Sequence, residues 1–227
     1  MKQVREYSEK EKSIFKGIMD LLNQGCGIHE LKVSDIALAA GIGKGTVYEY
    51  FSTKEEIIRE AVSYYVYKEF DTFTALIDKQ QNFTDTIYDI LNHTIEMLKT
   101  RFTSLLFMVV SLEESDVKQL IQEDRTLLPT VRSGMNEFIE KLCDKGRKEK
   151  LIGEDVSFEE CKLVLNGILT SFTNEVLFMR NKSLPGTAED SDSQPSRVDI
   201  LAEPFIDEEG LSELKDRVVK LILKALK

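Results

Sequence analysis

Hydroxyl and ammonium side chains are concentrated in one short stretch near the start of the 227-residue chain. The candidate contact residues are Ser34, Lys44, Gly45, Thr46, Tyr48, Glu49, Tyr50 and Lys54. Hydroxyl and ammonium groups at helix starts suit phosphate oxygens, and a glycine lets the backbone approach a duplex closely. Side chains of these types could contact the phosphates and bases of double-stranded DNA if helices present them together.

The chemistry of the individual side chains divides these contacts into two kinds. Thr46 and Tyr48 are the best candidates for base edges or thymine methyl groups. Glu49 could accept a hydrogen bond from a cytosine amino group, or it could be an ordinary solvated charge. Lys54 suits a phosphate, and Ser34 could make a similar contact.

Short helices are needed to position these side chains, and residues 31–58 predict them. Ser34 or Val33 opens the first helix, and Ser34 is a natural N-cap. Gly41–Gly43 ends that helix and eases the turn, a second helix runs over Lys44–Phe51, and another begins at Lys54. This layout is a helix-turn-helix, whose second helix can enter the major groove of DNA.

The spacing of apolar residues predicts which side of the second helix is buried. Val47 and Phe51 are four residues apart, so we expect them to face inward with Ile36. Tyr48 and Tyr50 could be half-buried packing residues, but their place in the full pattern favours an outward position.

The ordered string of residues resembles the DNA-binding signature of the TetR family of bacterial transcriptional regulators. The matching positions are Ile36-Ala37, Gly41-Ile42-Gly43, Thr46-Val47-Tyr48-Glu49-Tyr50-Phe51 and Lys54-Glu55. Gly43 replaces a more usual Ser, and Tyr50 stands where His is common. The resemblance covers residues 10–60. It implies an all-α fold, with a three-helix DNA-binding domain over 1–53 and a larger effector-binding and dimerisation domain over 54–227 that begins with a long fourth helix.

The remainder of the chain carries helical rather than strand periodicity. Helices are predicted over about 7–23, 54–80, 84–99, 102–113, 116–124, 128–148, 157–179 and 208–226. Residues 181–207 hold three of the four prolines and a polar run, so they predict a flexible loop.

An effector pocket and a dimer interface follow from the resemblance alone. Pocket candidates are aromatic, flexible or polar: Met97, Arg101, Phe102, Phe107, Met108, Asn166, Phe172 and Phe178. Interface candidates form apolar stripes on the last two helices: Cys161, Val164, Leu165, Ile168, Leu214, Val218, Leu221 and Ile222. The alternative for these stripes is the core of one protomer.

Composition limits the other classes of function. Residues 1–60 hold nine Lys/Arg and ten Asp/Glu, so the other residues carry nearly all of the net charge of −10. The three cysteines are too far apart for a disulfide framework or metal cluster, and the start has no secretory pattern. No catalytic signature appears, and the glycine-rich turn lacks the spacing of a nucleotide-binding loop. We expect neither enzyme activity, cofactor, metal nor membrane contact.

The sequence therefore predicts a cytoplasmic, ligand-responsive regulator. We expect a repressor that binds a palindromic operator as a homodimer and is released by a small-molecule effector. The alternative is an all-helical protein-binding scaffold or adaptor without DNA recognition, which would explain the acidic helices but not the string around Tyr48.

Overall fold

Helices make up nearly all of the chain that the computed structural model describes, which is residues 5–79, 81–99, 127–182 and 208–227. They are α1 (Glu9–Asn23), a 3-10 turn η1 (Ile28–Glu30), α2 (Val33–Ala39), α3 (Lys44–Tyr50), α4 (Lys54–Asp78), α5 (Phe83–Leu98), α8 (Leu127–Lys148), α9 (Phe158–Lys182) and α10 (Glu208–Ala225). These ranges contain no strand, which confirms the all-α prediction. The predicted helices over 102–113 and 116–124 lie outside the described residues, as does the predicted loop beyond Lys182.

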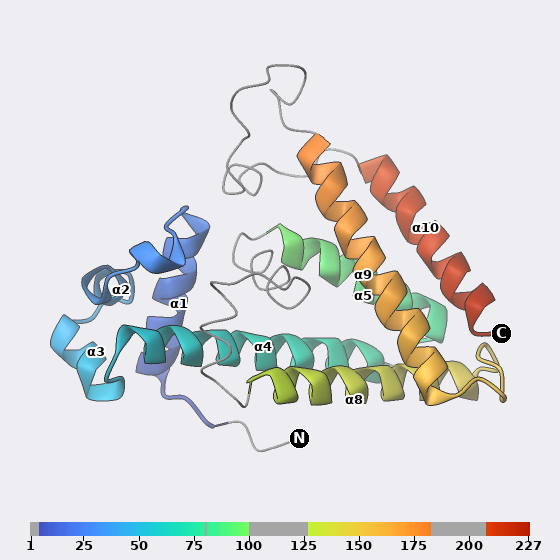
Figure 1. Cartoon of the computed structure of the whole chain (residues 1–227), viewed down its shortest axis with the longest axis horizontal. Helices are drawn as coiled ribbons and strands as arrows, with labels where there is room; N and C mark the ends of the chain where they lie inside the picture. Colours follow the sequence, from blue (N-terminus) through green and yellow to red (C-terminus); the bar gives the residue numbers. More distant parts are fainter. Residues whose placement is uncertain (1–4, 80, 100–126, 183–207) are drawn as a thin grey trace. The chain divides into compact units, whose positions relative to one another are not determined.

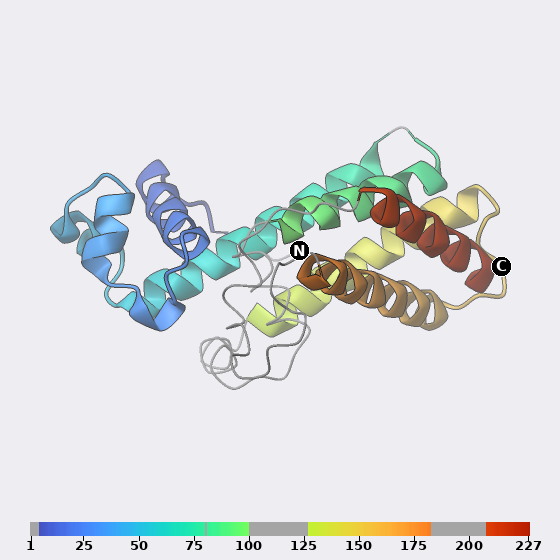
Figure 2. The ribbon, with the colours of Figure 1, turned by 90° about the horizontal axis from the view of Figure 1, so that it is seen from above.

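The chain divides into two compact units, and α4 continues from one into the other with the boundary between Glu69 and Phe70. The first unit contains α1, α2, α3 and the start of α4, coloured blue to cyan in Figure 1. The second contains the end of α4, α5, most of α8, α9 and α10. Figure 2 shows both groups of helices from a second direction.

The first helix begins where its capping residues dictate. The Ser8 side chain accepts a hydrogen bond from the Glu11 backbone, and the Glu11 carboxylate accepts one from the Ser8 backbone at 2.8 Å. This reciprocal capping box satisfies two N–H groups that a helix start leaves unpaired. The helix therefore starts at Glu9, two residues later than the expected start at residue 7.

A glycine lets α1 pack directly against the backbone of α2. A Cβ atom added at Gly17 would lie 3.0 Å from both the Ala40 nitrogen and the Ile36 carbonyl oxygen. No larger residue could keep this approach, because backbone atoms cannot rotate aside. The core of the unit forms around this contact from buried residues of all four helices, among them Ile14, Phe15, Ile36, Val47, Phe51 and Ile57.

Hydrogen bonds between helices stabilise the second unit, in addition to its apolar core. Both carboxylate oxygens of Glu149 lie within 2.9 Å of the backbone nitrogen of Phe83, at the start of α5. Tyr88 on α5 donates a hydrogen bond of 2.7 Å to Asp216 on α10. A carboxylate at a helix N-terminus also compensates the helix dipole, so Glu149 fixes the start of α5.

Candidate nucleic-acid interface

The turn between α2 and α3 has a backbone conformation that requires glycine. Gly41 has φ +69°, in the left-handed region that other residues rarely adopt. The Gly41 and Ile42 N–H groups donate to the carbonyl oxygens of Leu38 and Ala37, each at 3.0 Å. This arrangement satisfies the last carbonyls of α2 and sets the direction in which α3 leaves it.

The inner face of α3 is fixed by the core of the first unit. Val47 is fully buried and Phe51 is 1% exposed. The Phe51 ring lies 5.7 Å from that of Phe15 on α1, measured between centroids. The predicted inward positions of Val47, Phe51 and Ile36 are therefore confirmed, and α3 is anchored on one side only.

The outer face of α3 presents most of the predicted contact residues to solvent. Lys44, Gly45, Tyr48 and Glu49 are exposed, and Thr46 is partly buried. Tyr48 is 48% exposed, and the Lys44 ammonium lies 5.9 Å from the centroid of its ring, within range of a cation–π interaction. A phenol, an ammonium group and a carboxylate are thus available together on one short helix.

Tyr50 departs from the predicted outward position. It is partly buried and packs against the core of the unit. The reason is helical geometry, because Tyr50 follows the buried Val47 by three residues and so lies on the same side of the helix. The packing reading considered for Tyr50 is the better one, whereas Tyr48 stands free of the core.

Ser34 does not cap α2, contrary to the prediction. The N-cap is Lys32, which makes no side-chain capping hydrogen bond, and its carbonyl accepts from the Asp35 and Ile36 N–H groups. Val33 takes the first helical position because its side chain is buried in the core, at 9% exposure. The Ser34 hydroxyl is left exposed, 3.2 Å from a carboxylate oxygen of Asp35.

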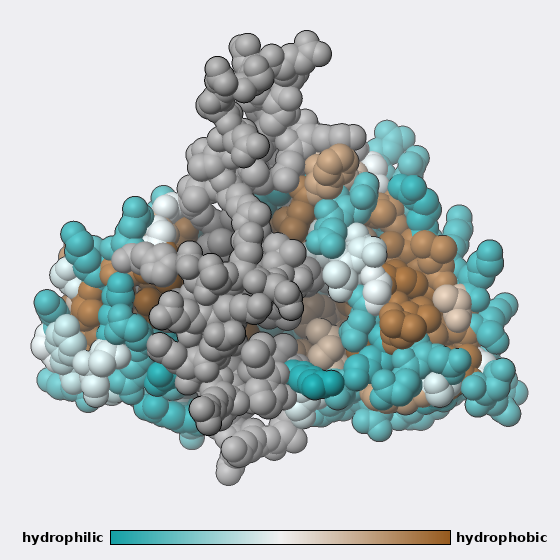
Figure 3. Space-filling view, viewed as in Figure 1, coloured by the Kyte–Doolittle hydropathy of each residue, from teal (hydrophilic) through white to brown (hydrophobic). Residues whose placement is uncertain are grey.

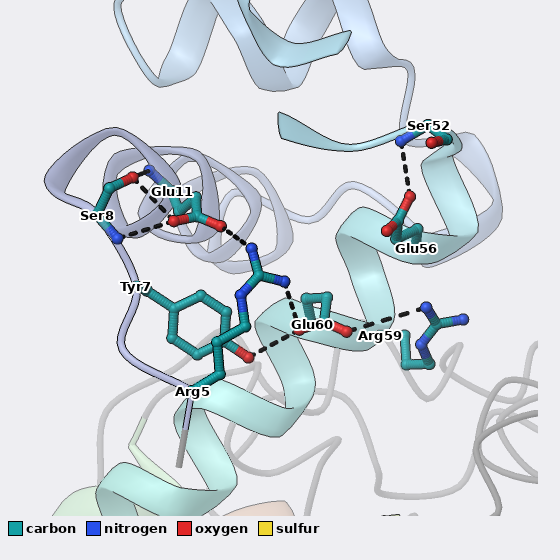
Figure 4. Close-up of polar contacts among 8 residues, drawn as sticks. All are labelled: Arg5, Tyr7, Ser8, Glu11, Ser52, Glu56, Arg59 and Glu60. Carbon is teal, nitrogen blue, oxygen red and sulfur yellow. Dashed lines mark hydrogen bonds and ion pairs between the residues drawn. The ribbon is translucent and has the colours of Figure 1, made fainter. Parts of the chain in front are cut away.

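The start of α4 places Lys54 at its first position. The Glu56 N–H donates to the Thr53 hydroxyl at 3.0 Å. The Glu56 carboxylate accepts from the Ser52 backbone N–H at 2.6 Å (Figure 4). Both contacts fix the segment that carries Lys54 relative to the end of α3.

A cluster that sequence reasoning missed ties the segment before α1 to α4. The Tyr7 hydroxyl donates to the Glu60 carboxylate at 2.8 Å, and the Arg5 guanidinium bridges Glu60 and Glu11, at 3.8 and 2.6 Å (Figure 4). Burial, and then the hydrogen bond to Glu60, hold the pKa of the Tyr7 phenol well above its usual value. Tyr7 and Glu60 are 53 residues apart in the sequence, so no local pattern could have revealed this pair.

Four of the eight pocket candidates lie in the part of the chain that the structure describes. Arg101, Phe102, Phe107 and Met108 lie outside it. Phe172 belongs to the core at 1% exposure, whereas Phe178 on the same helix is 51% exposed. Met97 and Asn166 are partly buried on α5 and α9.

Most of the predicted dimer residues lie in the core of one protomer. Cys161, Leu165, Leu214, Val218 and Ile222 are buried there, and Val164 and Ile168 are partly buried. Leu221 is 54% exposed, so its placement on the inner stripe of α10 is wrong. The inward stripes are the ones that the alternative reading assigned to the protomer core.

The described ranges contain no group of three or more His, Cys, Asp or Glu side chains arranged to hold a metal ion. None of their helices has the length and apolar character needed to cross a membrane.

A short helix anchored on one side by a glycine turn and exposed on the other defines a helix-turn-helix domain. Residues 14–61 match the model for bacterial regulatory proteins of the tetR family. The chain is also 30% identical over 112 residues to the HTH-type transcriptional regulator SAR0097 of Staphylococcus aureus. That match covers 48% of this chain and 58% of the relative.

Solved structures with the same fold cover nearly the whole chain. The fatty acid degradation regulator FadR from Bacillus halodurans matches with a TM-score of 0.64 at 17% identity, over 98% of this chain and 99% of that one. FadR from Bacillus subtilis, solved with stearoyl-CoA, matches with a TM-score of 0.58 at 16% identity, over 95% and 99%. Residues 14–61 therefore match the DNA-binding region of the tetR family of bacterial regulatory proteins, and the chain shares the fold of these regulators.

Proposed function

We propose that the chain is a DNA-binding transcriptional regulator that acts as a homodimer on a palindromic operator. The observation that carries this proposal is the outer face of α3, where Lys44, Tyr48 and Glu49 are exposed while Val47 is fully buried. A helix held on one side and free on the other can enter the major groove. Residues 1–53 form the DNA-reading domain, and residues 54–227 form the effector-binding and dimerisation domain.

The chemistry of each side chain determines whether it contacts a base or a phosphate in this proposal. Thr46 and Tyr48 contact bases, and Lys44, Lys54 and the exposed Ser34 hydroxyl contact phosphates. A Cβ added at Gly45 would meet no atom of the described residues within 4 Å, which leaves room for the duplex to approach the α3 backbone here. Tyr50 supports α3 from the core side and makes no base contact.

Dimerisation is required because one helix of two turns reads too few bases, and two-fold symmetry doubles the site. The exposed stripe of α9 provides a surface for it. Its residues recur at helical spacing and are uncharged: Leu163, Gly167, Thr170, Asn174 and Phe178. Leu163 is 76% exposed and Phe178 is 51% exposed.

We assign this stripe, together with the exposed Leu221 of α10, to contact with a second copy of the chain. Figure 3 shows hydrophobic residues gathered over α9 and α10 on the face in view. The stripe replaces the inward residues expected from the sequence, which are already covered within one protomer. Leu163→Glu is expected to turn the dimer into a monomer, measured by sedimentation, because it buries a charge without a partner.

The proposed control mechanism uses α4, which belongs to both units. A small-molecule effector bound in the second unit changes the position of α4, and with it the spacing of the two DNA-reading domains. Such a ligand acts only through its preference for the state that does not fit DNA, typically about 1–3 kcal/mol of coupling. The protein is a cytoplasmic repressor without enzyme activity in this proposal.

Selection of the purified protein against random duplex DNA, followed by sequencing, tests the proposal. An enriched inverted repeat with half-sites centred about 34–36 Å apart, or a multiple of this, supports a two-fold symmetric regulator. Folded protein that enriches nothing at low salt contradicts it, and a helical scaffold without DNA recognition becomes the better interpretation. Tyr48→Ala and Lys54→Ala should weaken binding while helicity and dimerisation are kept.

A further inference from the structure

The exposed side of α3 has an acidic centre. Gly45 and Glu49 are four residues apart, so they lie on the same stripe of the helix. Each residue advances about 100° around a helix, which places Gly45 and Glu49 each about 160° away from the buried Val47. The stripe that faces most directly away from the protein therefore carries one bare backbone position and one carboxylate.

No described residue binds the Glu49 carboxylate. Glu49 is exposed and makes no hydrogen bond or ion pair with another described residue. The nearest cation on the helix, Lys44, lies over the Tyr48 ring instead. Glu49 is thus available to a partner that approaches α3 from outside.

A carboxylate in the major groove is repelled by phosphates and by most base atoms. It accepts hydrogen bonds only, whereas guanine presents two acceptors, and thymine presents an acceptor and a methyl group. Adenine offers its amino group beside the N7 acceptor, which repels a carboxylate. Cytosine offers an amino group without a neighbouring acceptor on its major-groove edge. Cytosine is therefore the base that compensates the carboxylate best.

We propose that Glu49 is a specificity-determining residue that accepts a hydrogen bond from the amino group of one cytosine in each half-site. The inference rests on the proposed function and deepens it. Glu49 adds no affinity for phosphate. It selects one base pair by attraction and rejects the others by repulsion, which is how an unfavourable charge contributes to specificity.

The test compares Glu49→Gln with Glu55→Gln in the same DNA selection. Both substitutions remove one exposed carboxylate, but Glu55 lies in the first turn of α4 instead of on α3. The parent should prefer cytosine at one position of each half-site by about fivefold or more, and Glu49→Gln should relax that position alone. Glu55→Gln should leave the base preference at every position unchanged.

A second measurement removes the donor from the DNA. The selected cytosine is replaced by the 2-pyrimidinone nucleoside, which lacks the amino group. The affinity of the parent should fall by about fivefold or more on the modified DNA. The factor by which the affinity of Glu49→Gln falls should be less than half as large. Equal losses for the two proteins, or an unchanged profile for Glu49→Gln, overturn the inference while the regulator stands. A parent that enriches no inverted repeat overturns the proposed function and this inference together.

Discussion

One methyl group added at Gly17 or at Gly45 should have opposite effects on the first unit. A Cβ at Gly17 would lie 3.0 Å from two backbone atoms at the contact between α1 and α2, whereas a Cβ at Gly45 would meet nothing within 4 Å. Both glycines are inside helices, so Ala relieves the same intrinsic penalty at each position, about 0.5–1 kcal/mol. The two variants thus differ in steric environment and not in helix propensity.

The magnitude at Gly17 follows from the two opposing effects. Forcing a methylene-sized group into a packed site costs typically about 1–3 kcal/mol. The cost should lie near the upper end because the atoms that it meets are backbone atoms of Ile36 and Ala40. Subtracting the gain in helix propensity leaves Gly17→Ala destabilised by about 1–2 kcal/mol, and Gly45→Ala unchanged or stabilised by up to about 1 kcal/mol.

Tyrosine fluorescence during urea unfolding measures the difference in the first unit. The chain has no tryptophan, and six of its seven tyrosines precede Phe70, the exception being Tyr88. The signal therefore reports chiefly on the first unit. The effect of Gly45→Ala on DNA binding should be opposite to its effect on stability. This variant should lose affinity for DNA despite its stable fold, because its methyl group lies where the duplex approaches.

Two results would refute this reasoning. Gly17→Ala that unfolds at or above the parental urea concentration would mean that α1 can move away from α2 at little cost. Gly45→Ala that binds the selected operator with parental affinity would mean that the α3 backbone does not approach the duplex closely.

Substitutions at three further positions test contacts outside the outer face of α3. Tyr7→Phe should lower the stability of the first unit by about 1–2 kcal/mol in urea unfolding, because it removes the hydrogen bond to the Glu60 carboxylate. Burial raises the pKa of Tyr65 to about 12, from 10.0. The folded state therefore holds its proton longer than the unfolded state does, so stability should fall as the pH rises from about 10 to 12, and this fall should be smaller in Tyr65→Phe. Glu149→Ala should destabilise the second unit by about 1–2 kcal/mol in thermal unfolding followed by circular dichroism, and Glu149→Gln, which keeps one oxygen for the Phe83 N–H, by less.

Helix positions could be read from the sequence because amphipathic spacing and helix-ending residues are local. The predicted segments 84–99 and 128–148 agree with α5 and α8 to within one residue at each end. Ser34 shows where prediction of a helix start from the neighbouring residues fails. A serine favours an N-cap, but burial of the neighbouring Val33 determines which residue enters the helix first.

Helical periodicity predicts which side chains of α3 are exposed, so the exposure of Lys44, Tyr48 and Glu49 could be predicted from the sequence. Tyr50 is the exception, since the sequence does not show how wide the buried face of α3 is. The stripes on α9 and α10 were harder to interpret. Apolar spacing identifies an inward face but not what covers it, and here the protomer itself covers Cys161 and Leu165.

The charge of the chain bears on how operator binding can be selective. The first 60 residues carry nearly balanced charge, and most of the net charge of −10 lies beyond them. Non-specific affinity for DNA comes almost entirely from neutralised phosphates, so we expect the proposed regulator to have little of it. The exposed carboxylate of Glu49 on α3 should lower it further. In this proposal, useful affinity comes from base contacts and from two DNA-reading domains bound together, so a change in their spacing is an effective way to release the operator.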